Sequence, residues 1–378
     1  MMIASPIAQW SDDAVFILDF MNSTMPAPVT FTRASSAWYF NSSGVLMQVS
    51  TDAPRFDYGS FGGTTLLGLL IEEARTNRVV QCRDLTQSAW TKTSMTTALD
   101  QTGIDGTANA ASSATATTAN ATVLQTYSNI AASRVFSVFL KRITGTGTIQ
   151  LTQDNGSTWT TVTLTSSWQR FILPQQSTLN PTFGMKIVTS GDVVGFDCSQ
   201  LEAGTFATSP ILTTTAAVTR AIDVANVSSI PWFNATVGSF AIEAILRTAA
   251  PTNNQSTADF NDGSINNRIG LYTTPAGAAD ATVTISGTSA LSGVTIGGPS
   301  AGAVFRQAMR YIASNNKAAY AGSIDSSGTL TASALPTGIS QLRIGDRQDG
   351  TRPINGWVRR FRYWNYGFTN AQLQRVST

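Results

Sequence analysis

The chain contains no histidine, and this absence excludes much of the usual catalytic chemistry. Without imidazole there is no Ser-His-Asp triad, no Cys-His pair and no histidine-based zinc site. Only two cysteines, Cys82 and Cys198, occur among 378 residues, which is too few for a disulfide framework or a four-cysteine zinc site. We expect two buried thiols, and a single bridge between them is the alternative.

Charged residues are also scarce, at 12% of the chain with a net charge of +2. A nucleic-acid-binding protein needs a basic face that displaces counterions, so we expect no nucleic-acid partner. No apolar run approaches the roughly 20 residues that span a bilayer, and we expect no membrane insertion. The first residues, MMIASPIAQWSDDAVF, lack the basic and apolar regions of a signal peptide.

Glutamate is rare, which bears on glycoside hydrolysis. The chain has four: Glu72, Glu73, Glu202 and Glu243. A typical glycosidase needs two carboxyl groups about 5–9.5 Å apart. Adjacent residues of an extended chain point to opposite faces, which argues against the pair Glu72 and Glu73. We therefore expect no enzymatic activity.

The stretch TQDNGSTWTT at 152–161 fits the Asp-box pattern that recurs in sialidases. Only one clear box is present, without a propeller repeat of about 40–50 residues around it. The pattern predicts a hairpin with Asp154, Asn155 and Gly156 in its turn and Trp159 folded back onto the strands. It therefore indicates β-architecture rather than catalysis.

Threonine, serine, alanine, glycine and β-branched residues are abundant instead, which is typical of all-β proteins. In RVFSVFLKR at 134–142, Phe136, Val138 and Leu140 face one side and the intervening residues face the other. NSSG before VLMQV predicts a hairpin turn with Gly44 at positive φ. The fold class expected is all-β, with tandem β-sandwich or jelly-roll, lectin-like domains and a short C-terminal helix.

The strand signals divide the chain into four segments. We expect an N-terminal β-rich segment at 1–78, a jelly roll at 79–212, a linker at 213–230 and a second sandwich at 231–378.

The chain ends in a predicted helix. In FTNAQLQRVST, Thr369 and Gln372 form a capping-box pattern, and Phe368, Leu373 and Val376 are placed to attach the helix to the sheet.

Motifs along nearly the whole chain resemble a group of tailed-bacteriophage virion proteins. The opening module is similar through FTRASSAWYFNSSGVL, PRFDY and GLLIEEARTN. DLTQSAWTK, RVFSVFLKR, SSWQRF and QLEAGTFATSPI resemble a carbohydrate-binding-module-like jelly roll. FRQAMRYIASNNKAAYAGSI, LRIGDR and INGWVRRFRYWNYGFTNAQLQ resemble a laminin-G/concanavalin-like sandwich.

This resemblance implies a structural protein of the virion surface, assembled in the bacterial host cytoplasm. It does not choose between a tail-fibre or tail-associated component and a head fibre or capsid decoration. The implied partners are other virion proteins and further copies of the chain in a homo-oligomer, with host-surface polysaccharide as a possible ligand. The alternatives are a purely structural capsid- or tail-stabilising protein and, less favoured, a glycan-degrading depolymerase.

Lectin-like sandwiches bind sugars through aromatic rings and polar side chains, and five residues are candidate glycan contacts. They are Trp159, Tyr272, Trp364, Arg347 and Asp349. The alternative for each aromatic residue is a place in a core or subunit interface. For the loop GDRQDGTRP, the alternative is a solvated turn whose aspartates and arginines pair with each other.

We expect no cofactor and no metal. Asp and Asn oxygens in NDGSINN at 261–267 and DRQDG at 346–350 leave calcium open, although neither segment has EF-hand spacing.

Overall fold

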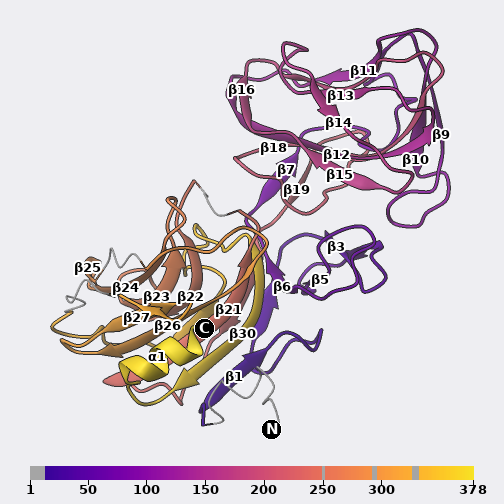
Figure 1. Cartoon of the computed structure of the whole chain (residues 1–378). Helices are drawn as coiled ribbons and strands as arrows, with labels where there is room; N and C mark the ends of the chain where they lie inside the picture. Colours follow the sequence, from indigo (N-terminus) through magenta and orange to yellow (C-terminus); the bar gives the residue numbers. More distant parts are fainter. Residues whose placement is uncertain (1–12, 249–251, 292–295, 326–331) are drawn as a thin grey trace.

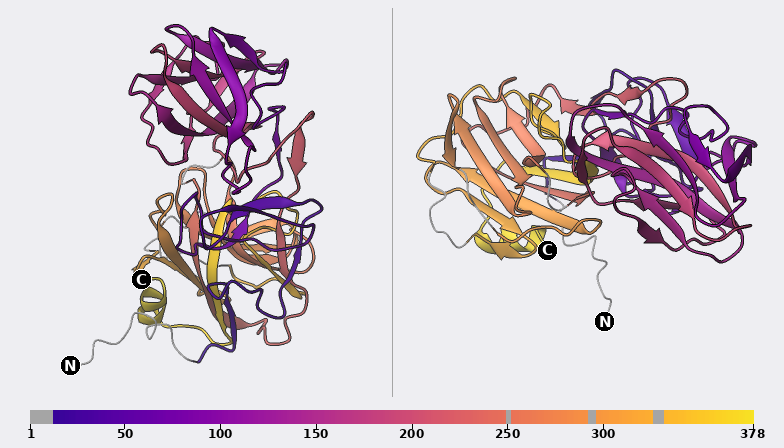
Figure 2. Two further views of the ribbon diagram at one scale, coloured as in Figure 1. Left: turned by 90° about the vertical axis from the view of Figure 1, so that its right-hand side faces the viewer. Right: turned by 90° about the horizontal axis from the view of Figure 1, so that it is seen from above.

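The computed structural model describes residues 13–248, 252–291, 296–325 and 332–378. These residues form two antiparallel β-sandwiches joined by a narrow connection, with one short helix near the C-terminus (Figures 1 and 2). The expected fold class is therefore confirmed. The first twelve residues, to which the signal-peptide argument applies, lie outside the described part. Within the described part, no helix has the length and apolar character needed to cross a membrane.

The first sandwich packs one sheet of six strands against one of five. The six-stranded sheet has the order β15-β12-β18-β10-β9, with β16 beside β12. Its strands are β9 (Met95–Gln101), β10 (Ala111–Ala116), β12 (Ala132–Thr144), β15 (Gln169–Ile172), β16 (Gln176–Thr178) and β18 (Val193–Ala203). The other sheet has the order β14-β13-β17-β11-β8. Its strands are β8 (Thr91–Thr93), β11 (Ala121–Thr126), β13 (Ile149–Thr152), β14 (Thr160–Val162) and β17 (Thr182–Ile187).

Alternation along β12 builds two separate cores, as the sequence predicts. Phe136, Val138 and Leu140 point between the two sheets, where aromatic and aliphatic side chains from both sheets enclose them. Phe139 points to the opposite face and belongs to a different apolar cluster. That second face is therefore covered by another part of the chain.

The covering element is a hairpin of β3 (Ala37–Phe40) and β4 (Leu46–Val49). Phe40 and Leu46 pack with Phe139 and Trp168, and the Phe40 and Phe139 ring centroids lie 6.0 Å apart. Gly44 has φ +68° in the hairpin turn, which confirms the turn predicted from NSSG. The N-terminal segment thus closes one side of the first sandwich.

The second sandwich packs a sheet of eight strands against one of seven. The eight-stranded sheet has the order β28-β27-β26-β21-β30-β6-β5, with β1 beside β30. Its strands are β1 (Phe16–Asp19), β5 (Phe56–Asp57), β6 (Gly68–Ile71), β21 (Val237–Leu246), β26 (Val304–Ile312), β27 (Lys317–Tyr320), β28 (Ser323–Ile324) and β30 (Gly356–Trp364). The seven-stranded sheet has the order β2-β20-β29-β22-β23-β24-β25. Its strands are β2 (Thr30–Thr32), β20 (Val224–Val227), β22 (Gln255–Asn261), β23 (Arg268–Thr273), β24 (Ala279–Ile285), β25 (Thr288–Leu291) and β29 (Gln341–Ile344).

Strand pairing differs from the expected segmentation in two places. First, the N-terminal segment supplies strands to both sheets of the second sandwich, for example β6, whose Ile71 pairs with Gly356. Second, the expected linker at 213–230 contains β20, which lies between β2 and β29. It also contains β19 (Val218–Arg220), which pairs with β7 (Arg75–Asn77). The first sandwich is therefore inserted into the second, as the indigo β1 and β6 beside the yellow β30 show (Figure 1).

Helix α1 (Asn370–Val376) lies on the outer face of the eight-stranded sheet. Thr369 and Gln372 form the predicted capping box, since each side chain bonds to the other residue's backbone. Phe368, Leu373 and Val376 are buried against small alanines of the sheet, so the predicted attachment is confirmed.

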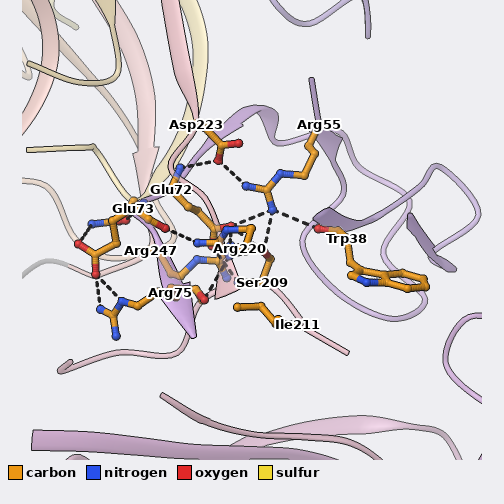
Figure 3. Close-up of polar contacts among 12 residues, drawn as sticks. Trp38, Arg55, Glu72, Glu73, Arg75, Ser209, Ile211, Arg220, Asp223 and Arg247 are labelled. Atoms are coloured by element: carbon orange, nitrogen blue, oxygen red, sulfur yellow. Dashed lines mark hydrogen bonds and ion pairs between the residues drawn. The ribbon is translucent and has the colours of Figure 1, made fainter. Parts of the chain in front are cut away.

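A buried ion network lies where the two sandwiches meet (Figure 3). Asp223, just before β20, pairs with Arg33 at 3.1 Å and with Arg55 at 2.5 Å. Glu72, just after β6, pairs with Arg55 at 2.9 Å and with Arg220 at 3.0 Å. These paired side chains are almost completely inaccessible to solvent.

Glu72 also connects the network to the first sandwich. Its carboxylate accepts bonds from the backbone N–H of Ser209 at 2.8 Å and from the Ser209 hydroxyl at 2.6 Å. Ser209 follows β18 of the first sandwich. Burial alone would raise the pKa of Glu72, but Arg220, Arg55 and Arg247 hold that pKa well below its ordinary value.

Candidate functional site

A polar cavity of about 390 Å³ lies on the outer face of the seven-stranded sheet. Period-two alternation produces it, because Ile269 and Leu271 of β23 point into the core. Arg268 and Tyr272, on the same strand, point outward and line the cavity. Thr282 and Thr284 of β24 line it beside them, and residues from the neighbouring loops complete the wall: Asn254, Ile265, Asn266, Gly287, Ser289, Arg347 and Arg352.

The loop at 345–353 carries two of these arginines. Its ends are joined by the Ile354 N–H donating to the Gly345 carbonyl at 2.8 Å. Inside it, the Asp346 Oδ1 atom accepts from the backbone N–H groups of Arg347 at 2.7 Å and Arg352 at 3.2 Å. The Asp346 carboxylate therefore organises the backbone that presents both guanidinium groups.

Asp346 has an unusual environment for a carboxylate. It is inaccessible to solvent, its Oδ2 atom makes no hydrogen bond to a described residue, and Arg343 Nη2 lies 3.6 Å away. Burial raises the pKa of Asp346 to about 7, against the opposing effects of Arg343 and the two N–H donors. The loop thus contains a group that titrates near neutral pH.

Most polar groups of the cavity are held by partners behind its surface. Arg268 Nη1 is 2.6 Å from Asp259 Oδ2, and the Tyr272 hydroxyl donates to Asp280 Oδ2 at 2.9 Å. Burial, together with Asp280, raises the pKa of Tyr272, so its hydroxyl stays protonated. These contacts fix the orientation of the arginine and of the tyrosine ring.

Arg352 is different, because its guanidinium has no ion pair or side-chain hydrogen bond within the described part of the chain. Burial lowers the pKa of Arg352, and Arg347 and Arg268 lower it further, while Asp349 and Tyr272 act in the opposite direction. An unpaired guanidinium near two others attracts an anionic group.

Three of the five predicted glycan contacts come together here. Tyr272 and Arg347 line the cavity, and Asp349 binds Arg347 with its Oδ1 atom 2.9 Å from the Arg347 Nε. The pairing expected for a solvated turn is therefore present, while the paired arginine still faces the cavity. Tyr272 is 8% exposed and forms part of the cavity floor.

The other two predicted contacts lie elsewhere. Trp159 belongs to the first sandwich, where it covers the Asp-box turn and the Lys186 ammonium lies 4.2 Å from its ring. The predicted hairpin is confirmed, since β13 pairs with β14, Gly156 has φ +75° and Asp154 accepts from the Thr158 N–H.

Trp364 is corrected as a ligand contact, because it is 0% exposed. It belongs to the apolar cluster that includes Leu373 and Val376 of α1, and the ring centroids of Trp364 and Phe368 lie 4.6 Å apart. The alternation in RFRYWNYG left open which aromatics are buried. Phe361 and Tyr363 enter the main core, and the helix buries Trp364 on the opposite face.

Sequence reasoning missed Arg268, Arg352, Thr282 and Thr284. The signal was available in part, since RIGLYT and ADATVTI both place polar residues at alternate positions. It could not be read as a site, because only the pairing of Arg268 with Thr284 places the two polar rows side by side.

The carboxylates considered for calcium have protein partners. Asp262 accepts from the Ser264 N–H and hydroxyl and from Asn267, as in an Asx turn. In the described ranges, no group of three or more acidic, cysteine or histidine side chains is arranged to hold a metal ion. Both cysteines are buried free thiols.

No protein-family model and no curated protein sequence matches the chain. Solved structures with partial likeness include a carbohydrate-binding module (CBM40) of the Ruminococcus gnavus IT-sialidase bound to α2,3-sialyllactose. It is 16% identical, with 38% of this chain and 84% of that chain covered and a TM-score of 0.30. Domain 4 of AbnA, a GH43 extracellular arabinanase from Geobacillus stearothermophilus in complex with arabinotriose, is 15% identical. That match covers 47% of this chain and 82% of the other, with a TM-score of 0.35.

A Trypanosoma rangeli sialidase in complex with the inhibitor DANA is 12% identical, with a TM-score of 0.32. The match covers 40% of this chain but 25% of the sialidase, so the chain spans about a quarter of that protein. Likeness at this level assigns no function, and the functional argument rests on the site itself.

Proposed function

We propose that the chain is a non-catalytic carbohydrate-binding protein that holds a glycan in the cavity on the outer face of the seven-stranded sheet. The observation that carries this proposal is the combination of a tyrosine floor with threonine, asparagine and arginine side chains around a cavity of about 390 Å³. Sugars need this combination, because their ring faces are apolar and their hydroxyls require hydrogen-bond partners.

The place of action that we propose is the surface of a bacteriophage virion, as an appendage or decoration that adheres to host-surface polysaccharide. The motifs shared with tailed-phage virion proteins support this location. Other virion proteins and further copies of the chain are the proposed partners. Labelling the protein on intact particles tests the location, and its absence from purified particles would refute it.

A glycan array with the purified chain and two variants tests the binding activity. Tyr272→Ala removes the cavity floor and is expected to weaken binding at least about ten-fold, the equivalent of about 1.4 kcal/mol. Trp159→Ala is the matched control, since Trp159 is a half-buried aromatic of the other sandwich. It should bind as the wild type does.

Other outcomes would favour the alternatives. Failure of the folded wild-type chain to bind any polysaccharide, with normal incorporation into particles, would favour the purely structural function. Turnover of a labelled polysaccharide would favour a depolymerase.

A further inference from the structure

A second cavity, of about 480 Å³, lies between the two sandwiches and adjoins the first. Its walls come from both sides of the junction. Glu73 and Arg75 lie at the start of the connection to the first sandwich, and Gly204 and Phe206 follow β18. The second sandwich contributes Thr252 before β22, Gln255 at the start of β22, and residues within and just after the loop at 345–353, among them Arg352 and Asn355.

The two cavities share part of their walls. Asn254 and Arg352 line both of them. The unpaired Arg352 guanidinium therefore stands where one cavity passes into the other. A ligand bound at Arg352 has space on both sides.

The junction cavity has two buried polar atoms without hydrogen-bond partners. Arg75 is 8% exposed and Gln255 is 1% exposed, yet Arg75 Nη1 and Gln255 Oε1 make no hydrogen bond to any described residue. Their remaining atoms are fixed: Arg75 Nε donates to Glu73 Oε1 at 2.5 Å, and Gln255 Nε2 donates to the Ile354 carbonyl at 2.8 Å. Buried polar atoms are normally satisfied, so Arg75 Nη1 and Gln255 Oε1 are exceptions among the residues that line this cavity.

The junction cavity also has an apolar surface. The Arg75 guanidinium lies over the Phe206 ring, 4.8 Å from its centroid, and this stacking keeps the arginine in place. The wall therefore combines a ring face with hydrogen-bonding groups, as the first cavity does.

Arginines outnumber acidic residues among the described residues that line the two cavities. Arg75, Arg268, Arg347 and Arg352 line the two cavities, whereas Glu73 is the single acidic side chain among the lining residues. Among the residues that the structure describes, three of these arginines have carboxylate partners and Arg352 has none. A ligand with its own carboxylate would supply the missing partner.

We infer that the two cavities form one continuous groove for an acidic polysaccharide, whose carboxylate binds Arg352 and whose neighbouring sugars occupy the junction cavity. The inference rests on the proposed function and adds the class of glycan and the direction in which it runs. Each cavity alone has the size of a small-molecule site, so a chain of several sugars fills the groove better than a monosaccharide does. Such a chain contacts both sandwiches.

The preference for an acidic glycan is tested by titration calorimetry of the whole chain with polygalacturonate oligomers and with their carboxyl-reduced counterparts. The wild type is expected to bind the acidic oligomers at least about ten-fold more tightly, with an affinity that falls as salt rises. Arg352→Gln should remove this preference, so that acidic and reduced oligomers bind this variant with the same affinity. Equal binding of acidic and reduced oligomers by the wild type would overturn the assignment of an acidic ligand.

The extent of the groove is tested with Thr252→Trp, which places a bulky side chain at the exposed rim of the junction cavity. Longer oligomers should then bind no better than disaccharides, whereas disaccharide binding should not change. Thr252→Ser is the matched control and should behave as the wild type does. Unchanged binding of long oligomers by Thr252→Trp would overturn the extension into the junction.

A failure of the groove inference can be distinguished from a failure of the proposed glycan binding. If Tyr272→Ala loses binding of both disaccharides and longer oligomers, the glycan binds in the first cavity, whatever Thr252→Trp shows. Absence of binding to every neutral and acidic polysaccharide would remove the proposed function and this inference together.

Discussion

Replacing Glu72 by glutamine removes one negative charge from the buried network at the junction. Its Oε2 atom accepts from Arg55 at 2.9 Å, from Arg220 at 3.0 Å and from the Ser209 hydroxyl at 2.6 Å. Its Oε1 atom accepts from the Ser209 N–H, and Arg247 lies 3.3 Å from it. An amide NH₂ in either position would face donors only, and the arginines would lose their carboxylate.

Removing one partner of a buried ion pair typically costs about 3–5 kcal/mol, because the remaining charge stays buried without compensation. We expect Glu72→Gln to lower the free energy of unfolding by this amount, measured by urea denaturation at pH 7. Asp19→Asn is the control, since the Asp19 and Arg360 side chains are 37% and 24% exposed and Arg360 also pairs with Glu243, so this change should cost less than about 1 kcal/mol. A Glu72→Gln variant within about 1 kcal/mol of the wild type would refute the reasoning.

The same Glu72 carboxylate makes the stability of the folded chain depend on pH. In the folded state the pKa of Glu72 is well below its ordinary value. At pH values between this pKa and that of the unfolded chain, Glu72 is therefore protonated more often in the unfolded chain than in the folded one. The stabilisation is complete above about pH 4.3, the pKa of an unperturbed glutamate, and is lost as pH falls toward the folded pKa. The difference in stability between wild type and Glu72→Gln should therefore narrow below about pH 4, and a difference that widens there would contradict this sign.

Asp346 should have the opposite effect, because its pKa is raised to about 7 and the folded state binds its proton more tightly. Between about pH 4 and 7 the carboxyl ionises in the unfolded chain but not in the folded one, so the free energy of unfolding should fall by about 1.4 kcal/mol per pH unit. Asp346→Asn should remove this pH dependence in a series of denaturation measurements. An unchanged slope of unfolding free energy against pH in the variant would contradict it. Leu373→Ala should cost about 2–5 kcal/mol, since Leu373 is fully buried between α1 and the sheet. Gln374→Ala, on the exposed side of the same helix, should change stability by less than about 0.5 kcal/mol, and equal effects of the two variants would show that the helix is not docked through Leu373.

The candidate site was only partly predictable from sequence. Tyr272, Arg347 and Asp349 were identified because aromatic and polar residues next to turns are typical of glycan sites, and the three lie together. Trp364 has the same local appearance, yet it is buried in the cluster that Phe368 and α1 form on the outer face of the sheet. No feature of RFRYWNYG distinguishes an aromatic that a helix covers from one that lines a cavity.

Local patterns determined the elements themselves. The alternation at 134–142 defines the two faces of β12, Gly44 and Gly156 mark hairpin turns, and Thr369 starts the final helix. In each case the responsible residues lie within a few positions of one another. Steric preference, side-chain alternation and capping are short-range effects, and so the sequence by itself determined them.

Only the tertiary structure decided which strands pair. β6 lies beside β30 although Ile71 and Gly356 are far apart in sequence, and β20, in the expected linker, lies inside a sheet. Both cavities depend on this pairing, since Arg75 and Arg352 come together only where the inserted sandwich meets its host. A strand's hydrogen-bonding groups are the same for any partner, so its place follows from the packing of the whole chain.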